Sequence, residues 1–244
     1  MDPILICTVG GSHQPIVKSI QENRPSFVYF LCSETDPGTN GKGSIEPIIG
    51  KGNVIKANPK DSSPTLPNIP TQVGLSSENF EVVIIPPDDL DKSFTIIRQK
   101  VEEIERKFEN VPILADFTGG TKSMTAALVT AVLESDVINL VFVTGNRPDL
   151  VRVRDGTEHS APAAVEAIRL ERRMAPFLKA WGRFAYDEAH SGLAQIKSPN
   201  KPSLRTSLFF ARDFSEAFAA WDRFDHTQAK NKFETYKPRV SQFW

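Results

Sequence analysis

A Thr-Gly-Gly-Thr-Lys run at 118–122 has the residue types and the spacing to bind a phosphate group. An apolar run at 111–115 precedes it and an alanine-rich segment at 124–134 follows, which predicts a strand that turns directly into a helix. Glycines let backbone N–H groups approach an anion closely, and the first turn of a helix carries partial positive charge. The threonine hydroxyls add hydrogen-bond donors, and Lys122 adds a full positive charge. The run therefore predicts a phosphorylated ligand.

Two better-known phosphate motifs do not fit this run. A nucleoside-triphosphate P-loop needs glycine at the two positions that Asp116 and Thr121 occupy. The dinucleotide fingerprint Gly-x-Gly-x-x-Gly is missing as well. What remains is a site for a phosphate ester or a nucleotide without a magnesium-bound triphosphate, beside the plain alternative of a structural turn that binds nothing.

A second polar turn, at 10–15, also follows an apolar run. Its Ser12 and Gln14 could bond a phosphate or the edge of a base, and His13 could stack on a base. A single histidine in a turn is more often a capping or surface residue. A third polar segment begins at Ser33, which is equally an ordinary strand end or a contact to a ribose or an adenine.

The elements that must position these turns alternate along roughly the first 150 residues. Apolar runs predict strands at 3–9, 27–32, 80–85, 111–115 and 137–143. Amphipathic or alanine-rich segments predict helices at 16–23, from the capping segment 88–91 to about 109, and at 124–134. This order predicts an α/β fold with a Rossmann-like, doubly wound, mainly parallel sheet. Ligands of such sheets bind beyond the carboxyl ends of the strands, so we expect four polar segments to converge there: 10–14, 33–35, 118–123 and 144–147.

We expect the sheet domain to cover residues 1–158, with an irregular insertion at about 37–77. Glycine, proline, serine and asparagine dominate the insertion, and its composition does not decide between a lid over the ligand and a disordered segment. A short edge strand is expected at 150–154.

Residues 159–244 predict a helical domain with an internal repeat. The segment 180–189 matches 220–229 at Ala, Trp, Arg, Phe, a ring residue and Ala, with a constant offset of 40 residues. Each unit should be one helix that ends near the Arg-Phe pair, a tight turn, and a second helix that opens at Tyr186 or His226. Two units are few for an independent solenoid, so we expect them to dock on the sheet domain or on a partner.

Arg183 and His190 have an Arg-x6-His spacing that occurs in some helical ribonuclease domains. The repeat argues against catalysis, because Lys230 takes the place of His190 in the second unit while the arginine is shared. We expect Arg183 and Arg223 to pair with carboxylates between helices.

The bulk composition excludes several classes of protein. A net charge of −1 over 244 residues argues against a broad basic face for duplex nucleic acid. The four histidines are scattered and no Cys-x2-Cys occurs, so neither a metal nor another cofactor is expected. Cys7 and Cys32 lie in apolar strands and should be buried, reduced thiols. No membrane span or signal-peptide pattern is found, which predicts a cytoplasmic protein without membrane contact.

The turns at 9–15 and 116–122 resemble those of CARF domains, the CRISPR-associated Rossmann-fold sensors of type III systems. The segment 84–90 and the Trp-Asp-Arg-Phe-Asp-His run at 221–226 also resemble one CARF-containing family. The resemblance covers about residues 1–155 with specific motifs, and the helical tail with fewer. It implies a homodimer that binds a cyclic oligoadenylate second messenger, cyclic tetra- or hexa-adenylate, across its two-fold axis. Binding would then act allosterically on a fused or separate effector in antiviral defence.

The resemblance also implies a set of site residues. Ligand contacts are expected from Gly10, Gly11, Ser12, His13, Gln14, Ser33, Thr118, Gly119, Gly120, Thr121, Lys122, Ser123 and Asn146. Some members of the family cleave their ligand, and Ser12 with Lys122 could support such a ring-nuclease reaction without a metal. The catalytic site of an effector is not recognisable in this sequence.

Two other functions are compatible with the same turn. One is a metabolic enzyme that grips a small phosphorylated substrate, although no acid/base pair or metal site is recognisable. The other is a transcriptional regulator with a helical DNA-reading domain, which the near-neutral charge and the tryptophan-rich repeat disfavour.

Overall fold

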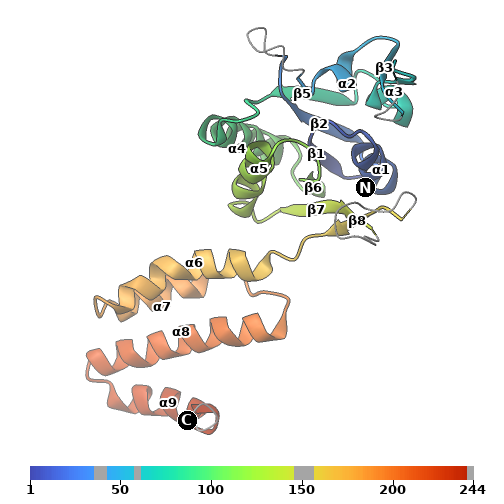
Figure 1. The fold of residues 1–244 in the computed structure, drawn as a ribbon. Coiled ribbons are helices and arrows are strands. Elements are labelled where there is room, and N and C mark those ends of the chain that lie inside the picture. Colours follow the sequence, from blue (N-terminus) through green and yellow to red (C-terminus); the bar gives the residue numbers. More distant parts are fainter. Residues whose placement is uncertain (36–42, 58–61, 146–156, 241–244) are drawn as a thin grey trace. The chain divides into compact units, whose positions relative to one another are not determined.

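The computed structural model describes residues 1–35, 43–57, 62–145 and 157–240. The chain divides into two compact units, Met1–Ala164 and Val165–Trp244 (Figure 1). The first unit contains a six-stranded sheet with helices on both faces, and the second contains helices. Within the described ranges, no helix combines the length and the apolar character that crossing a membrane requires.

The sheet has the order β5-β2-β1-β6-β7-β8, and all neighbouring pairs except β7 and β8 are parallel. Its strands are β1 (Ile4–Thr8), β2 (Phe27–Cys32), β5 (Phe80–Ile84), β6 (Ile113–Asp116), β7 (Ile138–Thr144) and β8 (His159–Pro162). All five residues of β1 are buried, as expected for a central strand covered on both faces. The predicted Rossmann-like, mainly parallel α/β fold is thus confirmed.

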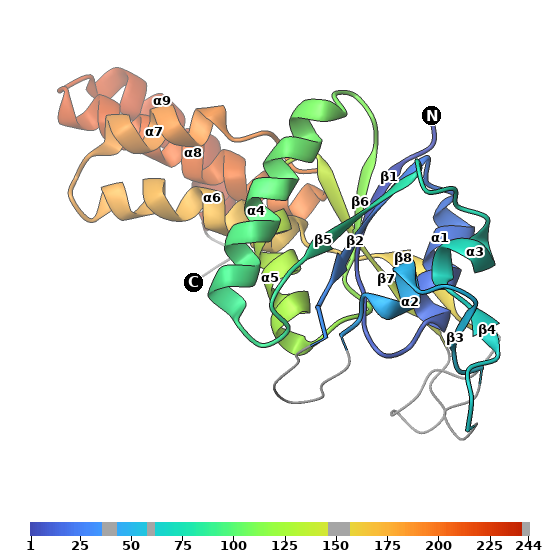
Figure 2. The same ribbon diagram turned by 90° about the horizontal axis from the view of Figure 1, so that it is seen from above.

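Helices cover the two faces of this sheet (Figure 2). On one face lie α4 (Leu90–Lys107) and α5 (Lys122–Leu133), and on the other lies α1 (Gln14–Asn23). The sequence explains α4 well, because Asp89 caps it by accepting from the N–H of Lys92 at 3.0 Å. Its apolar stripe, which includes Ile97, Val101 and Ile104, is buried.

The segment expected to be irregular contains short regular elements where the structure describes it. These are α2 (Glu46–Ile49), β3 (Asn53–Ile55), β4 (Leu66–Pro67) and α3 (Ile69–Val73), with β3 and β4 forming a small antiparallel sheet. Ile48, Ile55 and Ile69 are buried in one cluster with residues of β1, β2 and α1. The prediction of an irregular insertion at 37–77 was therefore wrong for these residues, because each apolar island is too short to show a period.

The boundary between the two units also differs from the expectation. β8 pairs antiparallel with β7, with Thr144 opposite His159, so residues 159–164 belong to the sheet unit. The predicted division after 158 was too early, because this edge strand has a polar, unpatterned sequence. The strand expected at 150–154 lies outside the described residues.

The second unit consists of two helix pairs, α6 (Glu166–Trp181) with α7 (Tyr186–Gln195), and α8 (Pro202–Asp222) with α9 (His226–Val240). The second helices open at Tyr186 and His226, as the repeat predicts. Both turns place a phenylalanine in the left-handed region, Phe184 at φ 60° and Phe224 at φ 64°. The sequence repeat is thus a repeat of structure.

The two repeated arginines form ion pairs with carboxylates. Arg183 donates to both oxygens of Glu188, at 2.9 and 3.0 Å. Arg223 donates to Asp187 of the first helix pair. Nδ1 of His190 lies 3.3 Å from the carbonyl oxygen of Arg212, so it faces the backbone of α8. The expectation that both arginines pair with carboxylates is confirmed.

Candidate functional site

The two glycine-rich turns meet at the carboxyl edge of the sheet. β1 and β6 are neighbours, with Cys7 opposite Asp116, so the turns that follow them lie side by side. A Cβ atom on Gly10 would lie 2.5 Å from the amide nitrogen of Gly120, and one on Gly119 would lie 2.4 Å from the carbonyl oxygen of Thr8. Backbone thus packs directly on backbone, which only glycine allows at these positions.

The hydroxyl of Thr118 is used inside the turn. It donates to Oδ1 of Asp116 at 2.5 Å and accepts from the N–H of Val143 at 2.7 Å, while its own N–H donates to the same Oδ1 at 2.8 Å. Asp116 is buried, and this burial raises the pKa of its carboxyl above the ordinary value. Thr118 therefore ties the ends of β6 and β7 together, and its hydroxyl is already committed.

Thr121 caps the helix that follows. Its hydroxyl donates to the carbonyl oxygen of Pro87 and accepts from the N–H of Met124 at 3.3 Å. Thr8 and Thr125 both donate to the carbonyl oxygen of Gly119, at 2.6 and 3.0 Å. The hydroxyls around the turn thus fix its shape and hold the carbonyl oxygen of Gly119.

Backbone N–H groups are what the turn leaves available. In the part of the chain that the structure describes, the amides of Gly11, Gly119, Gly120 and Thr121 donate to no protein acceptor. Gly120 has φ 87°, a conformation that glycine adopts without strain. The first-turn amides of α5 have no partner within the helix. This group of free amides, with the positive end of α5, has the chemistry of an anion site.

A cavity of about 650 Å³ opens beside these amides. Of the predicted site residues, it brings together Gly10, Gly11, Ser33, Gly120 and Thr121. The other lining residues are Val9, Thr35, Gly43, Ser44, Glu46, Pro47, Val54 and Met124. Most of these come from the segment that was expected to be irregular, and no motif in the sequence marked them.

Ser33 and Ser44 both line this cavity and are hydrogen-bonded to each other. The N–H of Ser33 donates to the hydroxyl of Ser44 at 3.0 Å, and the N–H of Ser44 donates to the hydroxyl of Ser33 at 3.1 Å. This reciprocal pair fixes the start of the segment around α2 against the end of β2. The segment thus forms one wall of the cavity.

Lys122 does not line this cavity but a neighbouring hollow, and Gly120 borders both spaces. Lys122 is exposed at the first position of α5 and, among the described residues, forms no ion pair. With Thr118 it lines a second, more open hollow of about 510 Å³, which Gly120 also borders. The remaining lining residues are Phe117, Thr125, Ala126, Val129 and Thr130.

Among the described residues, five other predicted site residues line neither space: Ser12, His13, Gln14, Gly119 and Ser123. Ser12 and Gln14 are exposed next to the first turn, and Ser123 is half-buried in the first turn of α5. His13 is buried, which lowers the pKa of its imidazole and favours the neutral ring. Its burial leaves little surface for stacking on a base. Asn146 lies outside the described residues.

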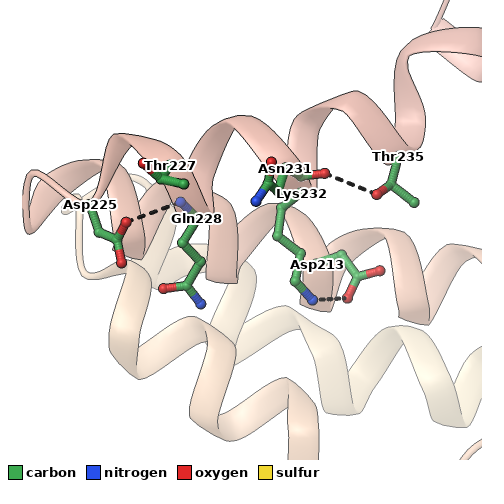
Figure 3. Close-up of a pocket in the computed structure, with 7 residues that line it drawn as sticks. All are labelled: Asp213, Asp225, Thr227, Gln228, Asn231, Lys232 and Thr235. Carbon is green, nitrogen blue, oxygen red and sulfur yellow. Dashed lines mark hydrogen bonds and ion pairs between the residues drawn. The ribbon is translucent and has the colours of Figure 1, made fainter.

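A third hollow, of about 490 Å³, lies between α8 and α9 in the helical unit (Figure 3). Lys232 points across it toward Asp213 at 3.6 Å and also pairs with Glu216 at 2.6 Å. These pairs satisfy the charges within the protein. No group of His, Cys, Asp and Glu residues able to hold a metal ion occurs in the described ranges.

No protein-family model matches the sequence, and no curated protein matches it. A search of solved structures found alignments over most of the chain. Csm6 from Enterococcus italicus, bound to cyclic hexa-2′-fluoro-hexa-dAMP, aligns with a TM-score of 0.59 and 13% identity, over 94% of this chain and 55% of its own. A type III CRISPR defence DNA nuclease activated by cyclic oligoadenylate aligns with a TM-score of 0.40 and 16% identity, over 90% of this chain and 34% of its own. Can2 from Sulfobacillus thermosulfidooxidans, in complex with cyclic tetra-adenylate, aligns with a TM-score of 0.40 and 12% identity, over 96% of this chain and 65% of its own.

The chain thus spans about half the length of Csm6. The likeness to Csm6 shows that the fold is CARF-like, so the resemblance drawn from the two turns is confirmed at the level of the fold. The turn at 10–15 and the turn at 116–122 lie together at the edge where ligands of such sheets bind.

Proposed function

We propose that this chain is a CARF sensor module that binds a cyclic oligoadenylate, cyclic tetra- or hexa-adenylate, and controls an effector in type III CRISPR antiviral defence. One observation carries the proposal: the free amides of Gly120 and Thr121 border a cavity, with the free amide of Gly119 and the charge of Lys122 beside them. Amides and one lysine suit a phosphodiester, which carries a single negative charge. The ligand bound to Csm6, whose fold is similar, supports the choice of a cyclic nucleotide.

The ligand is shared between two copies of the chain in this proposal. A cavity of about 650 Å³ has the size of a site for a small molecule, and a ring of four or six nucleotides exceeds it. A symmetric ring fits two equal sites that face each other across a two-fold axis. Each copy then neutralises only its own phosphates, which a chain of net charge −1 can do with local groups.

We further propose a slow, metal-independent ring-nuclease reaction in the hollow that Lys122 lines. The 2′-oxygen of a ribose attacks the adjacent phosphorus, the bond to the 5′-oxygen breaks, and the 5′-oxygen leaves with a proton. The product is a linear oligoadenylate that ends in a 2′,3′-cyclic phosphate. Lys122 would stabilise the charge that develops on the phosphate, and Ser12 would orient the ribose.

A thermal-shift panel tests the binding proposal. The samples contain cyclic tetra-adenylate, cyclic hexa-adenylate, linear tetra-adenylate, NAD or a sugar phosphate. One of the two rings should raise the Tm by at least about 4 °C at a hundredfold excess over its Kd, and the linear control should raise it less. A shift with the sugar phosphate alone would contradict the sensor and support the small-molecule enzyme. No shift with either ring would also contradict the sensor.

The ring-nuclease proposal predicts a linear product in a long incubation of the protein with cyclic tetra-adenylate and a metal chelator. Ser12→Ala should slow its formation at least about tenfold while binding stays within about twofold, since the backbone amides remain. Chromatography of the nucleotides measures both intact ring and product. Intact ring after long times, with binding demonstrated, would reject the cleavage step and leave the sensor proposal in place.

A further inference from the structure

The helical unit shows how the end of one helix pair is covered. Nε1 of Trp181 donates to the hydroxyl of Ser215 at 2.9 Å, and the Trp181 ring packs edge-on against Phe218 with centroids 5.0 Å apart. Ser215 and Phe218 lie three residues apart on α8, so both face the same neighbour. α8 thus covers the turn between α6 and α7 through one hydroxyl and one aromatic ring.

The second helix pair repeats a ring contact and a backbone hydrogen bond of this turn. Trp221 packs edge-on against His226 at 4.9 Å, as Trp181 packs against Tyr186 at 5.3 Å. The amide of Phe224 donates to the carbonyl oxygen of Trp221 at 2.9 Å, and Phe184 does the same to Trp181 at 3.0 Å. The two turns therefore present equivalent surfaces.

The difference is that no described residue covers Trp221 as Ser215 and Phe218 cover Trp181. Trp221 is 56% exposed, and in the described part of the chain its indole N–H meets no acceptor. The phenylalanines of the two turns do not differ in this way. Phe224 is 82% exposed, and Phe184 is 72% exposed although α8 packs on the first helix pair. The tryptophan is therefore the residue that distinguishes the two turns. A large exposed ring beside a second one is an apolar patch of the kind found at interfaces, where tryptophan often dominates the binding energy.

We propose that Trp221 is the centre of a docking surface for a helix of a partner polypeptide. The partner helix carries a small hydroxyl residue and an aromatic residue three positions apart, as α8 carries Ser215 and Phe218. Docked in the same way, it continues the existing interface between the two helix pairs by one more layer. Arg223 of the second pair also donates to Asp187 of the first pair. The position equivalent to Asp187 in the second pair is Thr227. An arginine five positions after the aromatic residue, as Arg223 follows Phe218, would meet a threonine in place of this carboxylate, which favours a partner other than a second copy of this chain.

This surface lies wholly within the helical unit, so the inference does not depend on which ligand the sheet unit binds. A fluorescein-labelled peptide of residues 203–220, held helical by a hydrocarbon link between positions 205 and 209, serves as the probe. It carries Ser215 and Phe218 and contains no tryptophan. Fluorescence anisotropy with the full chain measures its binding.

The peptide should bind the wild-type chain, and Trp221→Ala should weaken binding at least about tenfold. Phe209→Ala is the matched control, because it removes another exposed ring, 42% exposed, away from the turn, and it should leave binding within about twofold. A Phe218→Ala peptide should bind at least about tenfold more weakly. Circular dichroism and Tm establish that each variant is folded.

Three results would overturn the proposal. Equal binding by wild type and Trp221→Ala would mean that the peptide docks elsewhere, for example on Trp181 in place of α8, and no binding by wild type at the highest soluble concentration would mean that the surface does not accept such a helix. Sedimentation of the chain alone provides the remaining test. If Trp221→Ala lowers the order of self-association, a second copy covers the surface and the assignment to a partner polypeptide is wrong.

Discussion

Lys122→Glu is expected to abolish measurable binding of cyclic tetra-adenylate, with a loss of at least about 100-fold in affinity. The substitution replaces the Lys122 ammonium group beside the free amides by an anion, so an attraction to the phosphate becomes a repulsion. The fold should be unaffected, because Lys122 is exposed and forms no ion pair among the described residues. A glutamate at the first position of a helix also interacts favourably with the helix dipole, so the Tm should not fall.

Calorimetry with Arg106→Glu as the matched control separates a local effect from a change of net charge. Arg106 is exposed in the last turn of α4, and α4 begins after the carboxyl end of β5, which places Arg106 at the opposite edge of the sheet. This variant has the same charge change and should keep the wild-type affinity within about twofold. Equal affinities for Lys122→Glu and wild type would exclude this end of α5 as the phosphate site.

Gly10→Ala is expected to lower the free energy of unfolding by about 2 kcal/mol and to weaken ligand binding at least about tenfold. The added methyl group would lie 2.5 Å from the amide nitrogen of Gly120, which is backbone and cannot move aside as a side chain can. The two turns must therefore separate, and the amides that are proposed to hold the phosphate move with them.

The neighbouring glycine gives the matched control for this pair of turns. A Cβ atom on Gly11 has no heavy atom within 4 Å, so Gly11→Ala should change the free energy of unfolding by less than about 0.5 kcal/mol. Urea unfolding of both variants measures the difference. Equal stabilities of the two variants would contradict the close backbone packing of the two turns. If Gly10→Ala is destabilised but binds the ligand with wild-type affinity, that packing is not needed for binding.

The sheet and the helical repeat could be predicted from the sequence because their signals are local. β2 occupies the predicted 27–32, since a continuous apolar run needs no knowledge of its neighbours. The turns at Phe184 and Phe224 were predictable because one pattern occurs twice, 40 residues apart. The position of the candidate site followed from topology, as the carboxyl ends of β1 and β6 are adjacent.

The rest depends on contacts between distant residues. The hydroxyl of Thr118 accepts from the N–H of Val143, and nothing near Thr118 in the sequence indicates this bond. The sequence therefore predicts a ligand contact for Thr118. The wall of the cavity around Ser44 and Glu46 comes from elements of two to five residues, which are too short for periodicity. β8 is recognisable only through its pairing with β7.

The central claim is that the amides of Gly119, Gly120 and Thr121 bind a phosphodiester of the ring. Titration of isotope-labelled protein with cyclic tetra- or hexa-adenylate, followed by amide NMR, measures these groups directly. We expect their proton resonances to move downfield as each amide gains a charged acceptor, with saturation at one ring per two chains. Unchanged resonances at these three residues, together with ligand-induced shifts elsewhere in the protein, would contradict this claim.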